Sequence, residues 1–248
     1  MAEKAYKLLA EQEYISNKKA KELIDKGVVS VNGQKLVVAR GLMKESTVFK
    51  VKEIAEAKVI FQDDDILVVD KPAFLNAYEV ADSFPHCILL NRLDKETSGV
   101  MMFAKNEEFR TKAIKEFAQH KVYKEYVAVV EGKFIEEVEI NQPILTIKGK
   151  TARSKIDSDR GKPAKTTLTP NLVEGNKSKI KVVIENGRTH QIRVHCQYAG
   201  YPIIGDAQYG KTVPQVHRML LHSKVTRILH YEFQAKEPRE FYFFDFNK

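Results

Sequence analysis

Cysteine is scarce in this sequence, and its scarcity excludes two kinds of site. The 248 residues include only Cys87 and Cys196, too few for a disulfide framework or a four-cysteine zinc site. Cys196 lies close in the chain to His190 and His195, so a mixed metal site is a second interpretation. A small buried apolar side chain is the commoner role for such a cysteine, and we expect that role and no metal.

Long apolar runs are also missing. No stretch approaches the roughly 20 apolar residues that a membrane-spanning helix needs. Residues 1–5 (MAEKA) lack the apolar core of a secretory signal. We therefore expect a cytoplasmic protein with no membrane partner.

Acidic residues are outnumbered by basic ones, 33 against 41, which gives a net charge of +8. This excess favours a polyanionic partner without establishing one. Residues 148–165 are particularly basic, and their glycines and proline indicate an exposed loop or hairpin. The basic residues there are Lys148, Lys150, Arg153, Lys155, Arg160, Lys162 and Lys165. Such a loop can follow phosphates, with binding that weakens as salt rises, or it can be a solvated charged loop; the sequence leaves both open.

The first part of the chain, residues 1–55, has the pattern of a small α+β domain. Ser16 is a suitable N-cap and Gly27 a suitable stop for the helix between them, and Asn32-Gly33 is a strong tight-turn signal. The expected elements are helices over 5–12 and 17–26 and strands over 28–31 and 35–38. The junction that follows is not rich in proline or glycine, so we expect a short or structured linker.

The remainder, residues 56–248, contains more expected strands than helices. Asn106 is a suitable helix cap, and Pro72 ends a strand because proline cannot donate to a central ladder. The expected helices cover 107–119 and 188–198, and the expected strands cover 58–62, 66–69, 100–104, 123–130, 179–184, 219–228, 231–233 and 241–246. Strand–helix–strand alternation is rare and no internal repeat is present. This pattern favours an α+β domain with a mixed or mostly antiparallel sheet.

One carboxylate in the second domain stands out. Residues 92–99 (RLDKETSG) place Asp94 between an arginine and a Thr-Ser-Gly turn, just before an apolar strand. Aspartate and glycine are poor strand formers, so Asp94 is expected in a loop that leads into a rigid element. That position suits a nucleophile or a base. On spacing alone, an aspartate that caps a turn is the simpler interpretation.

The surrounding pattern resembles the RluA-type pseudouridine synthases, which isomerise uridine to pseudouridine in structured RNA. Four segments match this family in order: 92–99, 123–132 (YKEYVAVVEG), 186–195 (NGRTHQIRVH) with its continuation to residue 206, and 219–222 (MLLH). Four ordered matches are far more specific than one. The resemblance implies the pseudouridine synthase fold and isomerase activity, with no cofactor because the reaction includes no redox step.

The resemblance also assigns roles to single residues. It implies that Asp94 is the catalytic carboxylate, that Arg193 pairs with it, and that Tyr126 stacks on the uracil and assists proton movement. A lone carboxylate in a desolvated pocket tends to take up a proton. A guanidinium beside it keeps it charged and oriented through a two-pronged contact.

Further residues are candidates for substrate binding. The target uridine is stacked in folded RNA and must be flipped out, so an arginine beside Asp94 can fill the vacated stack or hold a phosphate. A leucine can form the apolar wall against the base. His190 and Gln191 are expected to hold local structure rather than to transfer protons. The candidates are Arg92, Arg188, His190, Gln191, Leu220 and Leu221.

The first domain resembles the small RNA-binding module named after ribosomal protein S4. In that interpretation Lys18, Lys19 and Lys21 face RNA; the alternative is a plain helical cap on the main domain. The module makes ribosomal RNA, especially that of the large subunit, the first expected substrate, with transfer RNA second. We expect a monomer.

Two positions depart from the family pattern. Asn91 stands where a histidine is usual, and residues 71–78 (KPAFLNAY) keep Lys-Pro but lose the usual glycine and the His-Pro ending. The second departure affects substrate contacts. Two other functions are alternatives: a non-enzymatic RNA-binding assembly factor, and a hydrolase with paired carboxylates or a metal. The second lacks a carboxylate pair or a metal-ligand motif at suitable spacing.

Overall fold

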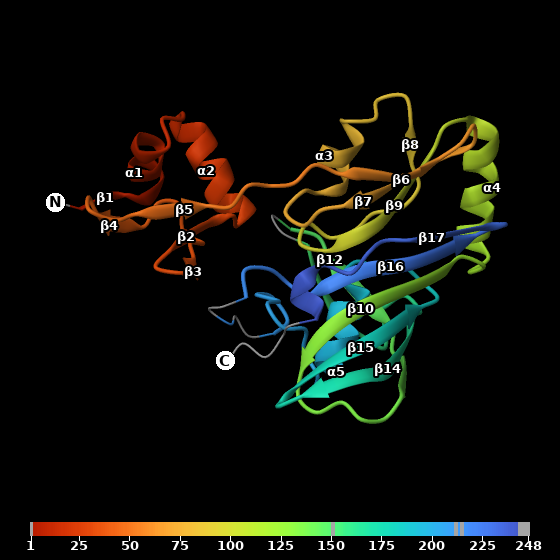
Figure 1. Ribbon diagram of the computed structural model, residues 1–248. Coiled ribbons are helices and arrows are strands. Elements are labelled where there is room, and N and C mark those ends of the chain that lie inside the picture. The colour runs from red at the N-terminus through yellow and green to blue at the C-terminus, as the bar shows by residue number, and fades with distance from the viewer. Residues whose placement is uncertain (1, 150–151, 211–212, 214–215, 243–248) are drawn as a thin grey trace. The chain divides into compact units, whose positions relative to one another are not determined.

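The computed structural model describes residues 2–149, 152–210, 213 and 216–242 (Figure 1). The chain divides into two compact units. The first comprises Met1–Ala55 with Val213–His217, and the second Glu56–Thr212 with Arg218–Lys248. Each unit is described by itself.

The first unit combines two helices with short strands. The helices are α1 (Ala5–Gln12) and α2 (Asn17–Lys26); β1 (Ala2–Lys4) pairs with β4 (Leu42–Lys44), and β2 (Val29–Val31) lies between β3 (Gln34–Lys35) and β5 (Phe49–Val51). The predicted cap and stop are confirmed. The Ser16 side chain accepts a hydrogen bond from the Lys19 amide, and Gly27 ends α2 in the left-handed conformation.

The returning strand expected over 35–38 is wrong beyond Lys35. Leu36 still donates its amide to the Val29 carbonyl at 2.8 Å, but the chain then leaves the sheet. Val37 and Val38 are 68% and 57% exposed, so no packing holds them in an extended ladder.

The second unit is built on a sheet of ten strands. Its main path runs β11-β14-β15-β10-β16-β9-β7-β6, with β17 paired to β16 and β8 paired to β9. The bounds are β6 (Lys58–Gln62), β7 (Ile66–Lys71), β8 (Ile88–Leu89), β9 (Ser98–Ala104), β10 (Tyr123–Glu131), β11 (Val138–Asn141), β14 (Lys165–Glu174), β15 (Lys177–Ile184), β16 (Leu221–Ile228) and β17 (Tyr231–Gln234). Among the described strands, only β16 and β9 pair in parallel. The expected α+β fold with a mixed, mostly antiparallel sheet is confirmed.

Both faces of this sheet are covered, which explains why β9 is buried along its whole length. Alternate side chains of a strand point to opposite faces, so Met101 and Phe103 join one core cluster and Val100 and Met102 join the other. Helix α4 (Glu107–Ala118) contributes to the second cluster through Phe109 and Ala113. Helices α3 (Ala77–Ala81) and α5 (Gln191–Tyr198) contribute to the first.

Cys196 of α5 is fully buried in the first of these clusters, and burial raises the pKa of its thiol. The role expected for it, a small buried apolar side chain, is confirmed.

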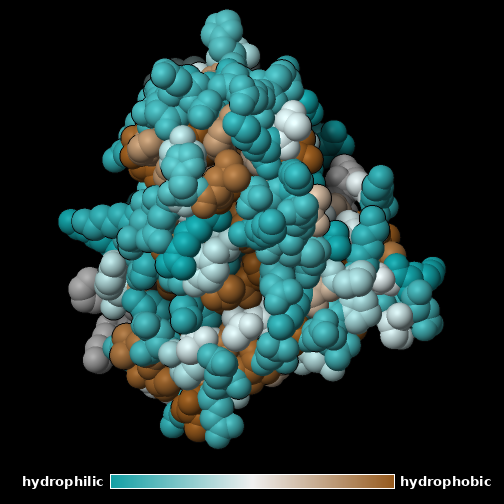
Figure 2. Space-filling view, turned by 90° about the vertical axis from the view of Figure 1, so that its right-hand side faces the viewer, coloured by the Kyte–Doolittle hydropathy of each residue, from teal (hydrophilic) through white to brown (hydrophobic). Residues whose placement is uncertain are grey.

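Hydrophilic residues cover much of the face shown in Figure 2, with apolar patches between them. The longest described helix, α4, has 12 residues, and no described helix has the length and apolar character that a membrane crossing requires.

Two expected elements are corrected. The helix predicted over 188–198 begins at Gln191, because His190 has left-handed backbone angles (φ 56°) and cannot continue a helix. The strand predicted over 241–246 is a 3-10 turn at Arg239–Phe241, with Phe241 buried against the Arg218 guanidinium 5.4 Å from its ring. Residues 243–246 of that prediction lie outside the described residues.

Gly99 marks the place where β9 approaches β16 most closely. It has a φ of +112°, and a Cβ atom on it would lie 2.0 Å from the Ser223 carbonyl oxygen. The neighbour is backbone, so it cannot move aside as a flexible side chain can. Only glycine fits this position of the parallel pair.

Gly99→Ala is expected to lower the free energy of unfolding by more than about 3 kcal/mol, or to prevent folding, through overpacking and a forced backbone shift. Urea unfolding followed by circular dichroism measures the effect. Gly175→Ala is the matched control, since Gly175 also has a positive φ of +58° but nothing within 4 Å of the added carbon. Equal losses in the two variants would show that the close approach is not the cause.

His222 is a fully buried residue of β16 in this strand pair. Its Nδ1 lies 2.9 Å from the Ser98 hydroxyl and its Nε2 lies 3.3 Å from the Ala235 carbonyl oxygen. A carbonyl only accepts, so Nε2 donates and Nδ1 accepts from the hydroxyl, which is the pattern of a neutral imidazole. Burial lowers the pKa of His222 to about 4.

The wild-type protein is therefore expected to lose stability as the pH falls from about 6.5 to 4. Over this range His222 becomes protonated in the unfolded chain but stays neutral in the native protein. This residue alone contributes up to about 3 kcal/mol over that range. Urea unfolding at several pH values tests it. His222→Gln should flatten the dependence; an unchanged slope in that variant would assign the loss to other groups.

Candidate active site

A pocket of about 80 Å³ lies where the four matched segments meet. Asp94 reaches it from the loop before β9, Tyr126 from β10, and Arg193 from α5, while Leu221 at the start of β16 closes the apolar side. A larger cleft of about 580 Å³ shares Arg92, Asp94, Tyr126 and other lining residues with it. Residues far apart in the sequence therefore form one site within the second unit.

Arg193 joins two carboxylates. Its Nη1 donates to Asp94 Oδ2 at 2.9 Å, while Nε and Nη2 donate to the two oxygens of Asp206 at 2.7 and 2.9 Å. The Asp206 side chain is 0% exposed and that of Asp94 is 29% exposed. The two-pronged contact is thus made to the buried Asp206, and Asp94 receives a single bond and stays open to the pocket.

Asp206 fixes the arginine because it is itself fixed. Its Oδ1 accepts the backbone amides of Gln208 and Tyr209 at 2.9 and 3.1 Å. Burial would raise the pKa of Asp206, but hydrogen bonds and charge from Arg193 hold it below its usual range. The guanidinium carbon also lies 4.8 Å from the centre of the Tyr209 ring. Asp206 and Tyr209 were missed as site residues in the sequence, although residue 206 closes one matched segment.

His190 presents a nitrogen to Asp94. The Tyr209 hydroxyl accepts the Ser154 amide at 2.7 Å and lies 2.9 Å from His190 Nδ1. When the hydroxyl donates to Nδ1, the proton of the neutral ring sits on Nε2. That Nε2 is 3.8 Å from Asp94 Oδ2. Burial lowers the pKa of His190, against the opposing charge of Asp94. In that tautomer a neutral imidazole N–H faces the carboxylate.

Tyr126 is aimed by an irregularity in its strand. The register between β10 and β16 shifts between Glu125 and Tyr126, and such bulges re-aim side chains. The ring is 8% exposed and lines the pocket with Asp94. Burial raises the pKa of Tyr126 to about 12, with Asp94 adding to the shift and a hydrogen bond with Ser223 opposing it. The phenol therefore keeps its proton at neutral pH.

Of the two candidate leucines, Leu221 lines the pocket and Leu220 does not. Leu220 is 1% exposed and its backbone bonds to Ile204 and Val129, so the prediction of a wall residue is corrected to Leu221 alone. Gln191 holds local structure as expected, because its amide nitrogen donates to the Lys165 carbonyl at 2.9 Å and its oxygen accepts the Arg188 amide at 3.0 Å.

Two arginines lie at the pocket and in the larger cleft. Arg92 Nη1 donates to the Tyr78 hydroxyl at 3.4 Å, and Arg188 Nε donates to the Pro163 carbonyl at 3.0 Å. Within the basic segment 148–165, β13 (Arg153–Ile156) pairs antiparallel with β12 (Ile144–Ile147), which precedes the segment. Lys150, named with that segment, lies outside the described residues.

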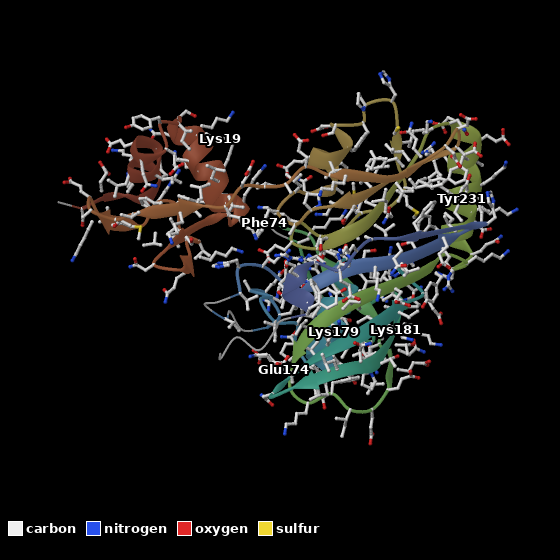
Figure 3. The ribbon with its side chains drawn as sticks, viewed as in Figure 1. Lys19, Phe74, Glu174, Lys179, Lys181 and Tyr231 are labelled. Atoms are coloured by element: carbon white, nitrogen blue, oxygen red, sulfur yellow. The ribbon has the colours of Figure 1, made fainter. Side chains whose placement is uncertain are left out.

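The three lysines expected to face RNA all lie on α2 of the first unit. Lys18 and Lys19 are exposed, and Figure 3 labels Lys19 on this helix. Lys21 is only partly exposed, with its Nζ 4.1 Å from the centre of the Tyr6 ring. The first unit therefore presents two exposed lysines of the three.

Lys71 ties the Asp94 loop to the end of β7. Its side chain is fully buried, and Nζ donates to the carbonyls of Pro72, Leu75 and Lys95 at 2.8, 2.6 and 3.2 Å. Burial, together with the charge of Arg218, lowers the pKa of Lys71 to about 7, although Asp94 opposes the shift. Lys95 directly follows Asp94, so this bond sets the backbone position of the carboxylate.

Lys71→Met is expected to lower the free energy of unfolding by about 3 kcal/mol or more, because it leaves three buried carbonyls without this donor. Turnover should fall as well, since the Asp94 loop loses an anchor. Urea unfolding and an activity assay measure the two effects. Lys58→Met, on the exposed strand β6, is the control. If Lys71→Met unfolds at the same urea concentration as the wild-type protein, the three hydrogen bonds of the Lys71 ammonium contribute nothing to stability.

The fold and the pocket together place an open carboxylate, a fixed guanidinium and an aromatic ring in one cavity, which is the composition of an enzyme active site. Residues 65–198 match the family described as RNA pseudouridylate synthase, and the chain belongs to this family of isomerases. An uncharacterized RNA pseudouridine synthase of Helicobacter pylori (strain J99 / ATCC 700824) is 50% identical over 240 residues, which are 96% of this chain and 99% of the relative.

A second relative is the ribosomal large subunit pseudouridine synthase D of Pasteurella multocida (strain Pm70). It is 26% identical over 276 residues, covering 91% of this chain and 85% of the relative. Among solved structures, human RNA pseudouridylate synthase domain containing 1 superimposes with a TM-score of 0.63 at 28% identity, over 75% of this chain and 84% of that one. The family predicted from the four motifs is confirmed.

Proposed function

We propose that this protein isomerises uridine in large-subunit ribosomal RNA and that Asp94 is the reacting carboxylate. The observation that carries the proposal is the 2.9 Å bond from Arg193 to Asp94 in a pocket walled by Tyr126. It combines a charged oxygen, a fixed cation and an aromatic ring in a space open to a flipped base.

Each group has a part in this reaction. The C1′–N1 bond of uridine breaks, the base turns, and a C1′–C5 bond forms; the proton lost from C5 is balanced by one gained at N1. Asp94 acts at C1′ as nucleophile or as base, or stabilises positive charge there. Arg193 orients it through their 2.9 Å hydrogen bond, because Asp206 holds the guanidinium from the other side. Tyr126 stacks on the uracil, and its protonated hydroxyl can donate.

Two features support the ribosomal target. The Pasteurella relative carries it in its name and aligns with most of this chain. The first unit has the two helices and the hairpin of the S4-like module that its sequence resembles, with Lys18 and Lys19 exposed on α2. We further propose that the enzyme acts as a monomer in the cytoplasm.

Mapping pseudouridines in RNA from cells with and without this protein tests the target. We expect one or more sites in large-subunit ribosomal RNA to disappear without it. Tritium release from 5-tritiated uridine in the unmodified RNA should confirm direct action by the purified protein. Sites lost only from transfer RNA would move the target there. Tight RNA binding without any release would favour the non-enzymatic assembly factor.

A further inference from the structure

Residues 71–78, where the sequence departs from its family, fix the position of the Tyr78 side chain. The chain passes Phe74 in a left-handed conformation (φ 74°) and enters the short helix α3 (Figure 3). Asn76 caps this helix by accepting the amides of Tyr78 and Glu79, and Glu79 accepts the Asn76 amide in return. Because the backbone amides at the start are satisfied, the helix direction is well defined.

The capped helix α3 directs the Tyr78 side chain toward solvent. Ala77 and Val80 of the same helix are 4% and 1% exposed and pack in the core, while Tyr78 is 61% exposed. A single exposed aromatic residue needs no explanation by itself. Tyr78, however, lines the 580 Å³ cleft that also contains Asp94.

The neighbours of Tyr78 suit nucleic acid. Its hydroxyl accepts a bond of 3.4 Å from Arg92, which also lines the inner pocket. Lys124 and Arg188 line the same cleft, and their positive charges suit the phosphates on either side of a base. An aromatic ring among cations is the usual composition of a stacking site for single-stranded bases.

We propose that Tyr78 stacks on a nucleobase next to the uridine that enters the Asp94 pocket, so that the cleft binds at least two nucleotides. The inference rests on the proposed function only in placing the reacting uridine at Asp94. Every base has a π-face, so this contact contributes affinity and register with little sequence preference. Arg92 then stands between the two bases.

The chain has no tryptophan, so Tyr78→Trp creates a single fluorescent reporter at the site. Unmodified large-subunit ribosomal RNA, purified from cells that lack the protein, is the probe. We expect its binding to quench the tryptophan. Tyr198→Trp is the matched control, because Tyr198 is 57% exposed and lines neither the pocket nor the cleft. Equal quenching in both variants, or none at position 78, would overturn the proposal.

Kinetics on the same RNA give the second test. Tyr78→Leu should raise KM about 5- to 150-fold, the range expected for losing one base–aromatic stack, with little change in kcat. Tyr78→Phe keeps the ring and should recover most of this loss, and Tyr198→Leu should leave KM unchanged. A Tyr78→Leu enzyme with the wild-type KM, or a Tyr78→Phe enzyme as impaired as Tyr78→Leu, would contradict stacking.

The outcomes separate this inference from the proposed function. If wild-type protein isomerises uridine but Tyr78→Trp is not quenched, the stacking site is wrong and the function stands. If the tryptophan is quenched selectively but no RNA is isomerised, the stacking site stands and the proposed function fails.

Discussion

Asp94→Asn is expected to abolish pseudouridine formation, by at least about 10³-fold in kcat, while RNA binding is retained. The amide has the shape of the carboxylate and can still accept a bond from Arg193, but it carries no charge to attack C1′ or to remove a proton. The fold should survive, because Arg193 keeps its two bonds to Asp206.

Tritium release measures the turnover, and gel retention at a fixed salt concentration measures the binding. Asp64→Asn, at an exposed turn, controls for the loss of one acidic side chain. Full turnover by Asp94→Asn would remove Asp94 from the chemistry. Loss of turnover together with loss of folding would make the residue structural, which urea unfolding of the variant distinguishes.

Arg193→Met is expected to lose both stability and activity. The substitution leaves Asp206, which is 0% exposed, as a buried charge without its cation, and such losses amount to about 3–5 kcal/mol. Asp94 loses its hydrogen bond from the guanidinium at the same time, so kcat should fall by at least about 10²-fold. Arg193→Lys should be intermediate, because one ammonium cannot reproduce three bonds in a fixed plane.

A double substitution separates the two roles of Arg193. Asp206→Asn removes the buried charge, so Arg193→Met with Asp206→Asn should regain most of the stability but none of the activity. Arg227→Met, which breaks an exposed ion pair with Glu232, should change little. If the double variant regained turnover, Arg193 would act only through Asp206 and not on Asp94.

Local rules predicted much of the fold, and tertiary contacts account for the errors. The helices at 5–12 and 17–26 have the predicted bounds, because caps, glycine stops and apolar spacing act over a few residues. The helix start at residue 188 was wrong because contacts of His190 with Tyr209, far along the chain, accompany its left-handed backbone. No pattern within the segment itself contains that information.

The same distinction holds for the site. Asp94, Tyr126, Arg193 and Leu221 were predicted together, since each lies in a matched segment, and the structure brings them to one pocket; their catalytic roles remain predictions. Asp206 and Lys71 were missed because their importance lies in burial and in partners from other loops. The available signal for Lys71 was a charged residue at the end of an otherwise apolar strand.

The contact at Gly99 has a consequence for how substrate enters. The loop that carries Asp94 leads into β9, and the wall residue Leu221 opens β16. These strands touch backbone to backbone where even a methyl group has no room. The parallel pairing of β9 with β16 at this contact therefore gives both sides of the pocket one shared backbone support, and we expect substrate to enter a pocket whose width these two strands set before it binds.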